Sequence, residues 1–255
     1  MKAPFIGIFL CVIFFIKTEL NAISYNLVLD KPNIEITPLT EKIGHTWVNG
    51  VVWDKPLIYE FYSLLKQAKS DIVVLDIGAQ TGCFSLLAKY FPYSTWYAFE
   101  PIQEAVTALQ DNVKLNAINN VSVLQTAVSD FSGTITLKMP DMGVWGLATI
   151  GATPLRFDTV VSEREVPCID LDSFVRTNNI KRIDFIKIDT EGAELSILRG
   201  AQQMILRDHP VILMEYNEMN MKQCGVTKEE INQFLTEVGY TWKQISSDDI
   251  LCLPL

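Results

Sequence analysis

The stretch VVLDIGAQTG, residues Val73–Gly82, decides the fold, because it is a short apolar strand that runs directly into a glycine loop. The run from Asp71 to Asp76 is rich in β-branched residues, and glycines follow at positions 78 and 82, which is typical of a parallel strand that feeds a ligand-binding loop. The loop is nonetheless a poor dinucleotide fingerprint. The pattern G-x-G-x-x-G, laid on Gly78, finds Gln80 and Cys83 where its second and third glycines belong. The stretch therefore predicts a ligand site and leaves the ligand open.

The composition fits one α/β domain with a full core. Of the 255 residues, 49% are hydrophobic and 20% are charged, which is enough apolar material to fold without further support. The formal net charge is −9 at pH 7. Because nucleic-acid backbones are bound by clustered Lys and Arg, this charge argues against a nucleic-acid partner. The oligomeric state is not readable from the composition.

The first 22 residues differ from the rest of the chain. Lys2 precedes an apolar run from Phe5 to Ile16, and Leu20-Asn21-Ala22 offers a weak cleavage site, so we expect a signal peptide or membrane anchor over residues 1–22. The run is shorter than the roughly 20 apolar residues that span a bilayer. A working signal or anchor would export the protein or hold it at a membrane; otherwise it stays in the cytoplasm. We expect an N-terminal cap over residues 23–70 and the main domain over residues 71–255.

Strands alternate with helices along the main domain. This alternation predicts an α/β fold with a mostly parallel sheet and helices on both faces. Seven strands are expected, over residues 71–76, 94–100, 121–125, 183–188, 211–214, 240–245 and 250–253. The last two should form a C-terminal antiparallel hairpin. We also expect a small hairpin over Gly133–Met139 and a single helix over Glu194–Leu206.

Acidic residues end four of these strands; they are Asp76, Glu100, Asp189 and Glu215. Because the carboxyl ends of parallel strands share one rim, we expect a cluster of carboxylates at the ligand crevice. Such a cluster repels a pyrophosphate and attracts a ligand that carries a sulfonium and an ammonium, as S-adenosylmethionine (SAM) does. Glu100 is also placed to accept hydrogen bonds from both ribose hydroxyls, although NAD enzymes place an acid there too.

The chain resembles the FkbM-type methyltransferases, within the broad class of SAM-dependent Rossmann-like enzymes. The matching stretches lie between about Val73 and Glu218 and are VVLDIGAQTGCFSLLA, WYAFEP, NVKLN, NVSVLQTAVSD, IDLDSF, IDFIKIDTEGAELSILRGA and VILMEYNE. The occurrence of IKIDTEGAE in register with AFEP is specific, whereas DIGAQTG alone indicates only the broad class. The resemblance implies a Rossmann-like methyltransferase fold and an O-methyltransferase that acts on sugars or secondary metabolites.

The resemblance also implies a set of donor contacts. It assigns the ribose of SAM to Glu100, and it puts Ala127, Val128 and Ser129 at the border of the adenine, with plain core packing as an equal alternative for Ala127 and Val128. Around the methionine part of SAM it places Asp76, Gly78, Ala79, Thr81 and Gly82.

Methyl transfer to a hydroxyl requires that a base remove the hydroxyl proton. Asp189 ends the fourth strand and Glu191 lies on the turn after it, so these two are the catalytic candidates. Glu194 lies in the first turn of the following helix, where a carboxylate favours the positive end of the helix dipole, and we expect a structural role for it.

Metal assistance is the alternative for the acceptor side. Metal-dependent catechol-type methyltransferases place an acid after the fourth strand and an Asp-Asn pair after the fifth, and Asp189, Glu215 and Asn217 resemble that set. Such oxygen ligands suit magnesium or calcium. Because Glu215 and Asn217 are not adjacent, we expect these two residues to contact the substrate rather than a required metal.

Trp145, which lies between glycines in the segment 139–149, is expected either to stack on a sugar face or to anchor its loop. Two other function classes stay open. One is an NAD-dependent oxidoreductase, and the other is a non-catalytic binding module on a methyltransferase scaffold, which a signal peptide would favour because SAM is a cytosolic metabolite.

Overall fold

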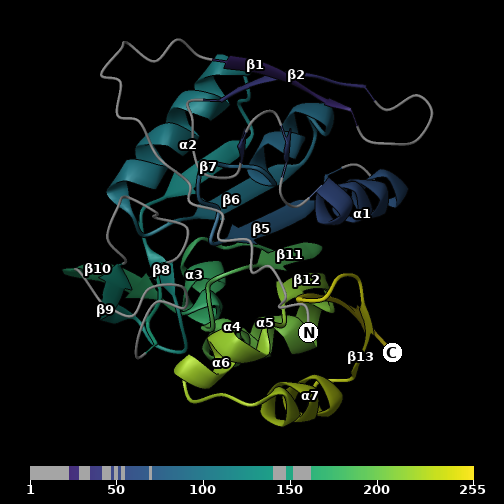
Figure 1. Ribbon diagram of the computed structural model, residues 1–255. Coiled ribbons are helices and arrows are strands. Elements are labelled where there is room, and N and C mark those ends of the chain that lie inside the picture. Colours follow the sequence, from purple (N-terminus) through teal and green to yellow (C-terminus); the bar gives the residue numbers. More distant parts are fainter. Residues whose placement is uncertain are drawn as a thin grey trace, which may run out of the picture.

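The computed structural model describes residues 23–28, 35–41, 47–48, 51–52, 55–68, 71–139, 148–151 and 162–255 (Figure 1). The expected signal peptide or anchor over residues 1–22 and the candidate Trp145 lie outside these ranges, so they stay predictions. Within the described ranges, no helix is both long enough and apolar enough to cross a membrane.

A seven-stranded sheet forms the centre of the protein, in the order β13-β14-β12-β11-β5-β6-β7. Its strands are β5 (Val73–Ile77), β6 (Thr95–Phe99), β7 (Val121–Leu124), β11 (Phe185–Ile188), β12 (Val211–Glu215), β13 (Tyr240–Gln244) and β14 (Asp249–Pro254). Neighbours from β7 to β12 run parallel, whereas β14 runs antiparallel to both β12 and β13. The predicted fold class, with its C-terminal antiparallel hairpin, is confirmed.

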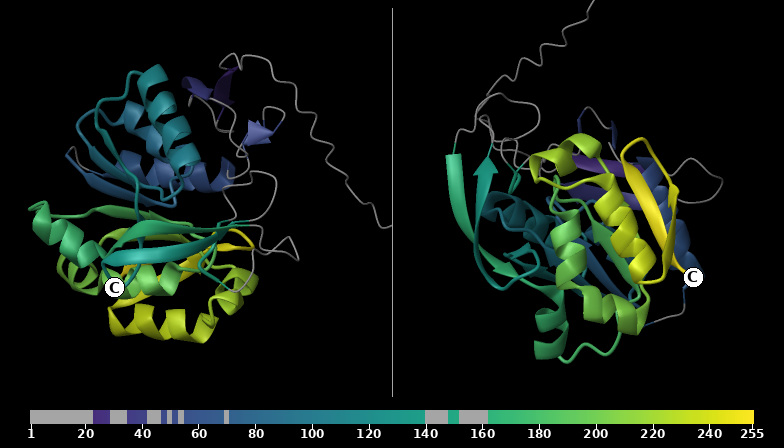
Figure 2. Two further views of the ribbon diagram at one scale, coloured as in Figure 1. Left: turned by 90° about the vertical axis from the view of Figure 1, so that its left-hand side faces the viewer. Right: turned by 90° about the horizontal axis from the view of Figure 1, so that it is seen from below.

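Helices cover both faces of this sheet (Figures 1 and 2). They are α1 (Lys55–Gln67), a 3₁₀ helix (Ser85–Tyr90), α2 (Gln103–Leu115), α3 (Leu171–Thr177), α4 (Glu194–Gly200), α5 (Gln202–Asp208), α6 (Glu218–Gln223) and α7 (Lys228–Glu237). The alternation of side chains along β5 explains the two layers, since Val74 packs with α1 and the 3₁₀ helix while Leu75 packs with α3, α4, α5 and α7.

Helix α1 packs directly on the sheet. The Phe61 ring makes edge contacts with Phe84, Trp96 and Phe185, with ring centroids 5.6, 6.2 and 6.1 Å away. Four short strands precede this helix and pair as two antiparallel ribbons: β1 (Ile23–Val28) with β2 (Glu35–Glu41), and β3 (Trp47–Val48) with β4 (Val51–Val52). The boundary that we expect near residue 70 thus falls after a helix that already belongs to the core of the sheet.

Two expected elements differ in the structure. Gly133–Met139 is one strand, β9, rather than a hairpin, and it pairs with β10 (Ser162–Ile169), which itself pairs with β8 (Ala127–Val128). The expectation was wrong because the partner of β9 comes after a long intervening segment and no local turn signal reveals it. The single helix expected from Glu194 is divided into α4 and α5.

Helix α4 ends at Gly200, where it lies against the residue that follows β8. A Cβ atom on Gly200 would lie 2.1 Å from the Ser129 carbonyl oxygen. The two residues are about 70 positions apart in the chain. The helical periodicity of the sequence therefore does not predict this contact.

The chain changes direction across the sheet between β5 and β11. From β5 it builds outward through β6 to β7, and from β11 it builds the other way to β12. In open α/β sheets, ligands bind at the carboxyl ends of the strands at such a switch point. Here the two strand ends nearly touch, because a Cβ atom on Gly78 would lie 1.9 Å from the carbonyl oxygen of Asp189. Gly78 also has a positive φ of 72°.

We therefore predict that Gly78→Ala lowers the free energy of unfolding by about 2–5 kcal/mol, as the sum of left-handed backbone strain and overpacking. Gly225→Ala is the matched control, because Gly225 has the same φ of 72° with nothing within 4 Å of an added Cβ, and only the backbone cost of about 1–2 kcal/mol should remain. Urea denaturation measures both values, and equal losses would show that the approach to Asp189 does not constrain position 78.

Candidate active site

The glycine loop after β5 is held by backbone hydrogen bonds. The N–H groups of Gly78 and Ala79 both donate to the Phe99 carbonyl at 3.0 Å, and Asn112 of α2 donates through Nδ2 to the Thr81 carbonyl at 2.9 Å. Asn112 is fully buried. The loop is thus fixed against β6 on one side and α2 on the other.

The loop residues divide into those that shape it and those that a ligand can reach. Ala79, Thr81 and Gly82, which the resemblance placed around the methionine part of SAM, are buried, whereas Gly78 and Gln80 are partly exposed. Gln80 was not among the expected contacts. It adopts a positive φ of 49°, which is uncommon for a residue other than glycine, so a ligand would meet the loop mainly at Gly78 and Gln80.

Glu100 lies beside the loop and is already hydrogen-bonded through both carboxylate oxygens. Oε2 accepts from the Gln80 N–H at 2.9 Å, and Oε1 accepts from the Ile102 N–H at 2.8 Å. Burial raises the pKa of Glu100 to about 7, against the lowering effect of these two N–H groups and of Lys187. Because each carboxylate oxygen has two lone pairs, one acceptor position on each stays free for a hydroxyl.

Asp76 does not lie at the crevice surface. Only 1% of the residue is exposed, Ser85 donates through Oγ to its Oδ2 at 2.5 Å, and the Lys187 ammonium lies 3.6 Å from its Oδ1. Its carboxylate is thus covered by protein atoms in this structure, and the contact with the donor that the resemblance implies stays a prediction. Asp76 is covered because it precedes the end of β5 and lies under the 3₁₀ helix and beside β11.

Lys187 of β11 is a residue that the sequence did not single out. Its side chain is 6% exposed, and its Nζ donates to the Gly78 carbonyl at 2.9 Å. The same Nζ lies 3.6 Å from Asp189 Oδ2 and 5.0 Å from the centre of the Phe84 ring. A lysine inside the otherwise apolar strand FIKI was the signal that could have identified it, since a buried cation requires partners.

The three residues expected at the adenine differ in their exposure to solvent. Val128 and Ser129 are buried, and Val128 belongs to the main core. Ala127 is partly exposed and packs beside Ile102 and Val166. Of the three, Ala127 alone offers an accessible surface near the end of β7.

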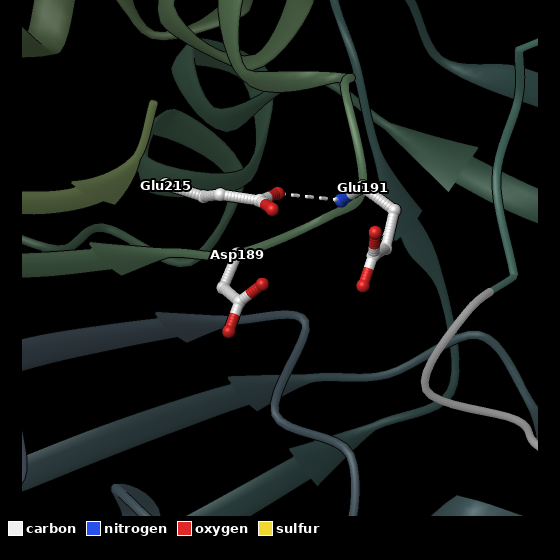
Figure 3. A group of neighbouring side chains, drawn as sticks. All are labelled: Asp189, Glu191 and Glu215. Carbon is white, nitrogen blue, oxygen red and sulfur yellow. Dashed lines mark hydrogen bonds between the residues drawn. The ribbon is translucent and has the colours of Figure 1, made fainter. Parts of the chain in front are cut away.

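Three carboxylates gather after β11 and β12 (Figure 3). One oxygen from each of Asp189, Glu191 and Glu215 lies within 4.8 Å of the others, and the Glu191 N–H donates to Glu215 Oε2 at 3.2 Å. Asp189 retains 39% exposure of its side chain. Of the four strand-end acids, Asp189 and Glu215 belong to this cluster together with Glu191, whereas Asp76 and Glu100 are buried beside the glycine loop. Asp189 is next to that loop.

Asn220, rather than Asn217, is the amide that joins this cluster. Its Nδ2 donates to Glu191 Oε2 at 2.7 Å and to Glu215 Oε1 at 2.5 Å, and the residue is 2% exposed. Asn217 caps α6 instead, since its Oδ1 accepts from the N–H groups of Met219 and Asn220. Its side-chain oxygen is thus engaged at the start of the helix, which it stabilises, and the contact of Asn217 with a substrate stays a prediction.

The acids of the cluster influence each other. Burial raises the pKa of Glu215 well above its usual value, and the charges of Glu194, Asp189 and Glu191 raise it further. Glu194 is buried, and its Oε1 accepts from Thr190 and Gly192 of the turn before α4. Glu194 therefore stabilises the turn before α4, as we expected, whereas Glu215 holds a proton more readily than an ordinary glutamate.

A single short segment of the region 140–161 is described, and it touches this turn. Thr149 donates through Oγ1 to the Glu191 carbonyl at 2.8 Å, and it pairs with Lys138 of β9. Thr149 therefore links the acidic turn to β9.

The sequence of this chain is similar to a family model and to several named methyltransferases. The model of the family described as the Methyltransferase FkbM domain matches residues 76–241. Methyltransferase 1 of Beauveria bassiana is 27% identical over 51% of this chain and 58% of that protein. The 2-O-methyltransferase NoeI of Sinorhizobium fredii is 25% identical over 64% and 69% of the two chains. The hexuronic acid methyltransferase AglP of Haloferax volcanii is 22% identical over 68% and 65%. The chain thus spans 58% of the length of the fungal relative.

Among solved structures, the methyltransferase FkbM of Methylobacillus flagellatus KT superposes with a TM-score of 0.49 at 15% identity, over 72% of this chain and 43% of that one. The family match covers the glycine loop, Glu100 and the acidic turn in one continuous range. On that match, the chain belongs to the FkbM methyltransferase family.

Proposed function

We propose that this protein is a SAM-dependent O-methyltransferase whose acceptor is a hydroxyl of a glycan or another small molecule. One observation supports this proposal above the others. At the switch point between β5 and β11, the glycine loop and Glu100 lie on one side, and the carboxylates of Asp189, Glu191 and Glu215 lie on the other. A methyl donor and a hydroxyl acceptor require these two kinds of surface next to each other.

The residues of the donor side fit SAM. Each oxygen of Glu100 accepts one backbone N–H and has a second lone pair for a ribose hydroxyl, and the partly exposed Gly78 and Gln80 lie beside it. SAM supplies a methyl group on a positively charged sulfur. The nearby carboxylates favour that positive charge and oppose the pyrophosphate of NAD, which is the physical reason for preferring a methyl donor to a nicotinamide.

The residues of the acceptor side can remove and hold a proton. Asp189 is the most exposed carboxylate next to the loop, and Glu191 is held beside it by Asn220. Both are the catalytic residues that we propose. Glu215, whose pKa is raised by burial, has a carboxylate oxygen within 4.8 Å of an oxygen of both residues. Methyl transfer then depends on aligning the acceptor oxygen with the donor methyl group.

The proposed acceptor class is based on the names of two relatives. The relatives NoeI and AglP are named as a 2-O-methyltransferase and a hexuronic acid methyltransferase. These names favour a hydroxyl of a sugar as the methylated group. We further propose that Trp145 stacks on such a sugar. Glu215 is the second residue that we propose to contact the substrate.

The first test is calorimetric titration with S-adenosylhomocysteine (SAH) and, separately, with NAD. Binding of SAH alone is expected. Binding of NAD without SAH would replace the proposal with an oxidoreductase. SAH binding without methyl transfer to any of a panel of neutral glycosides, uronosides and phenols would favour the non-catalytic binding module.

Asp189→Asn is expected to lower kcat roughly 10²–10⁴-fold, the usual worth of a general base, while the SAH dissociation constant changes little. Transfer of radiolabelled methyl from SAM measures the first value and calorimetry the second. Glu218→Gln is the control, because Glu218 is an exposed acid of α6 that pairs with Lys222. If both variants turn over like the parent protein, Asp189 is not the base.

The pKa of Glu100 predicts a pH dependence of donor binding. With a pKa of about 7, the ionised carboxylate accepts the ribose hydroxyls and both backbone N–H groups, whereas the protonated form would direct a hydrogen at one of its N–H partners. SAH affinity should therefore fall as the pH drops below about 7, approaching tenfold per pH unit. In Glu100→Gln the affinity should be low at every pH, and an unchanged slope in that variant would assign the titration to another group.

Removal of metal separates the two ways of activating the acceptor. Asp189 already faces the Lys187 ammonium, and Glu191 and Glu215 already face the Asn220 amide, so we expect turnover to persist after exhaustive chelation. Loss of turnover that magnesium restores would instead assign Asp189, Glu191 and Glu215 as ligands of a divalent cation.

A further inference from the structure

Lys187 contacts both the glycine loop, at Gly78, and the acidic cluster, at Asp189. In the sheet it lies opposite Asp76 of β5 and opposite Leu213 of β12, so it occupies the strand at the switch point. Its ammonium donates to the Gly78 carbonyl at 2.9 Å and lies 3.6 Å from both Asp76 Oδ1 and Asp189 Oδ2. Its two carboxylate partners are thus one residue of β5 and the residue that directly follows β11.

Core packing does not require a charge at this position. Burying an ammonium costs free energy unless it is paired and hydrogen-bonded, and buried ion pairs are often no more stabilising than apolar residues of the same size. The Phe84 ring, whose centre lies 5.0 Å from Nζ, would also contact an apolar side chain at residue 187. An apolar residue could make neither the two ion pairs nor the hydrogen bond to Gly78, and of these contacts only the hydrogen bond holds the loop backbone.

That hydrogen bond completes the attachment of the loop. The N–H groups of Gly78 and Ala79 are held by the Phe99 carbonyl, and the Gln80 N–H is held by Glu100. The Gly78 carbonyl is held by Lys187. Three successive loop residues are therefore fixed, and Lys187 is the group that fixes them from the acceptor side of the crevice.

We infer that Lys187 is a positioning residue for donor binding, which holds the Gly78 carbonyl and thereby sets the part of the loop that the donor meets. Asp76 acts on the loop through Lys187 and not by contact with the donor. The inference rests on the proposed function, because the ligand whose affinity Lys187 controls is the proposed donor.

Three variants of the full-length chain test this role, each with the SAH dissociation constant from calorimetry and the midpoint of thermal unfolding. Lys187→Met removes the ammonium and should weaken SAH binding roughly tenfold to a hundredfold, the usual worth of a hydrogen bond from a charged donor. It also leaves Asp76 as a buried carboxylate beside an apolar side chain, so its unfolding midpoint should fall. Asp76→Asn keeps Lys187 and the Ser85 contact and should change SAH affinity only a few-fold.

The double variant Asp76→Asn, Lys187→Met is decisive, because it removes the buried charge that the single lysine variant leaves without its partner. Its unfolding midpoint should recover towards that of the parent protein, while SAH affinity stays as low as in Lys187→Met. Lys114→Met, an exposed lysine of α2, is the control and should bind SAH like the parent.

Two results would overturn the inference. One is parental SAH affinity in Lys187→Met. The other is recovery of affinity together with stability in the double variant, which would mean that Lys187 only balances the charge of Asp76. Absence of SAH binding by the parent protein itself would be a different failure, since it would overturn the proposed function and remove the basis of the inference with it.

Discussion

The close approach of β5 and β11 at the switch point is the constraint on which the rest of the site depends. With no Cβ at Gly78, the loop passes against the Asp189 carbonyl, and the donor and acceptor surfaces come to lie side by side. The parallel sheet supplies this arrangement, because both strands end at the same rim. The same contact makes the loop sensitive to what lies beneath it, and there the protein places a buried ammonium, Lys187.

The acids at the ends of the strands are therefore not equivalent, because they differ in burial and in hydrogen-bonding partners. Asp76 is buried against Lys187 and Ser85, whereas Asp189 remains partly exposed. The first acid pairs with the lysine that holds the Gly78 carbonyl, and the second is accessible to a ligand. Glu100 combines burial with two N–H donors, which leaves its pKa about 7 and its remaining lone pairs available. Identical positions at the ends of strands thus give different chemistry, since burial and partners differ.

Much of the fold was predictable because its signals are local. The strand and loop over Val73–Gly82, the order of strands and helices, and the final hairpin all follow from short-range patterns of apolar residues and turns. The elements that were wrong depend on distant contacts. Strand β9 finds its partner only after the segment 140–161, and α4 ends where Gly200 meets Ser129. In the site, Asn220 replaced Asn217 because one residue caps a helix and the other faces the acids.

By itself, the sequence determined the strand that ends in a glycine loop, the family, and the acids that converge on one rim, since each is encoded in contiguous residues. Only the tertiary structure decided which of those acids are accessible to a ligand, that Lys187 connects the loop to β11, and that Gln80 is partly exposed while Ala79 is buried. The physical reason is that burial and partnership are properties of residues far apart in the chain. A carboxylate acquires its role from what packs against it, and sequence spacing does not record that packing.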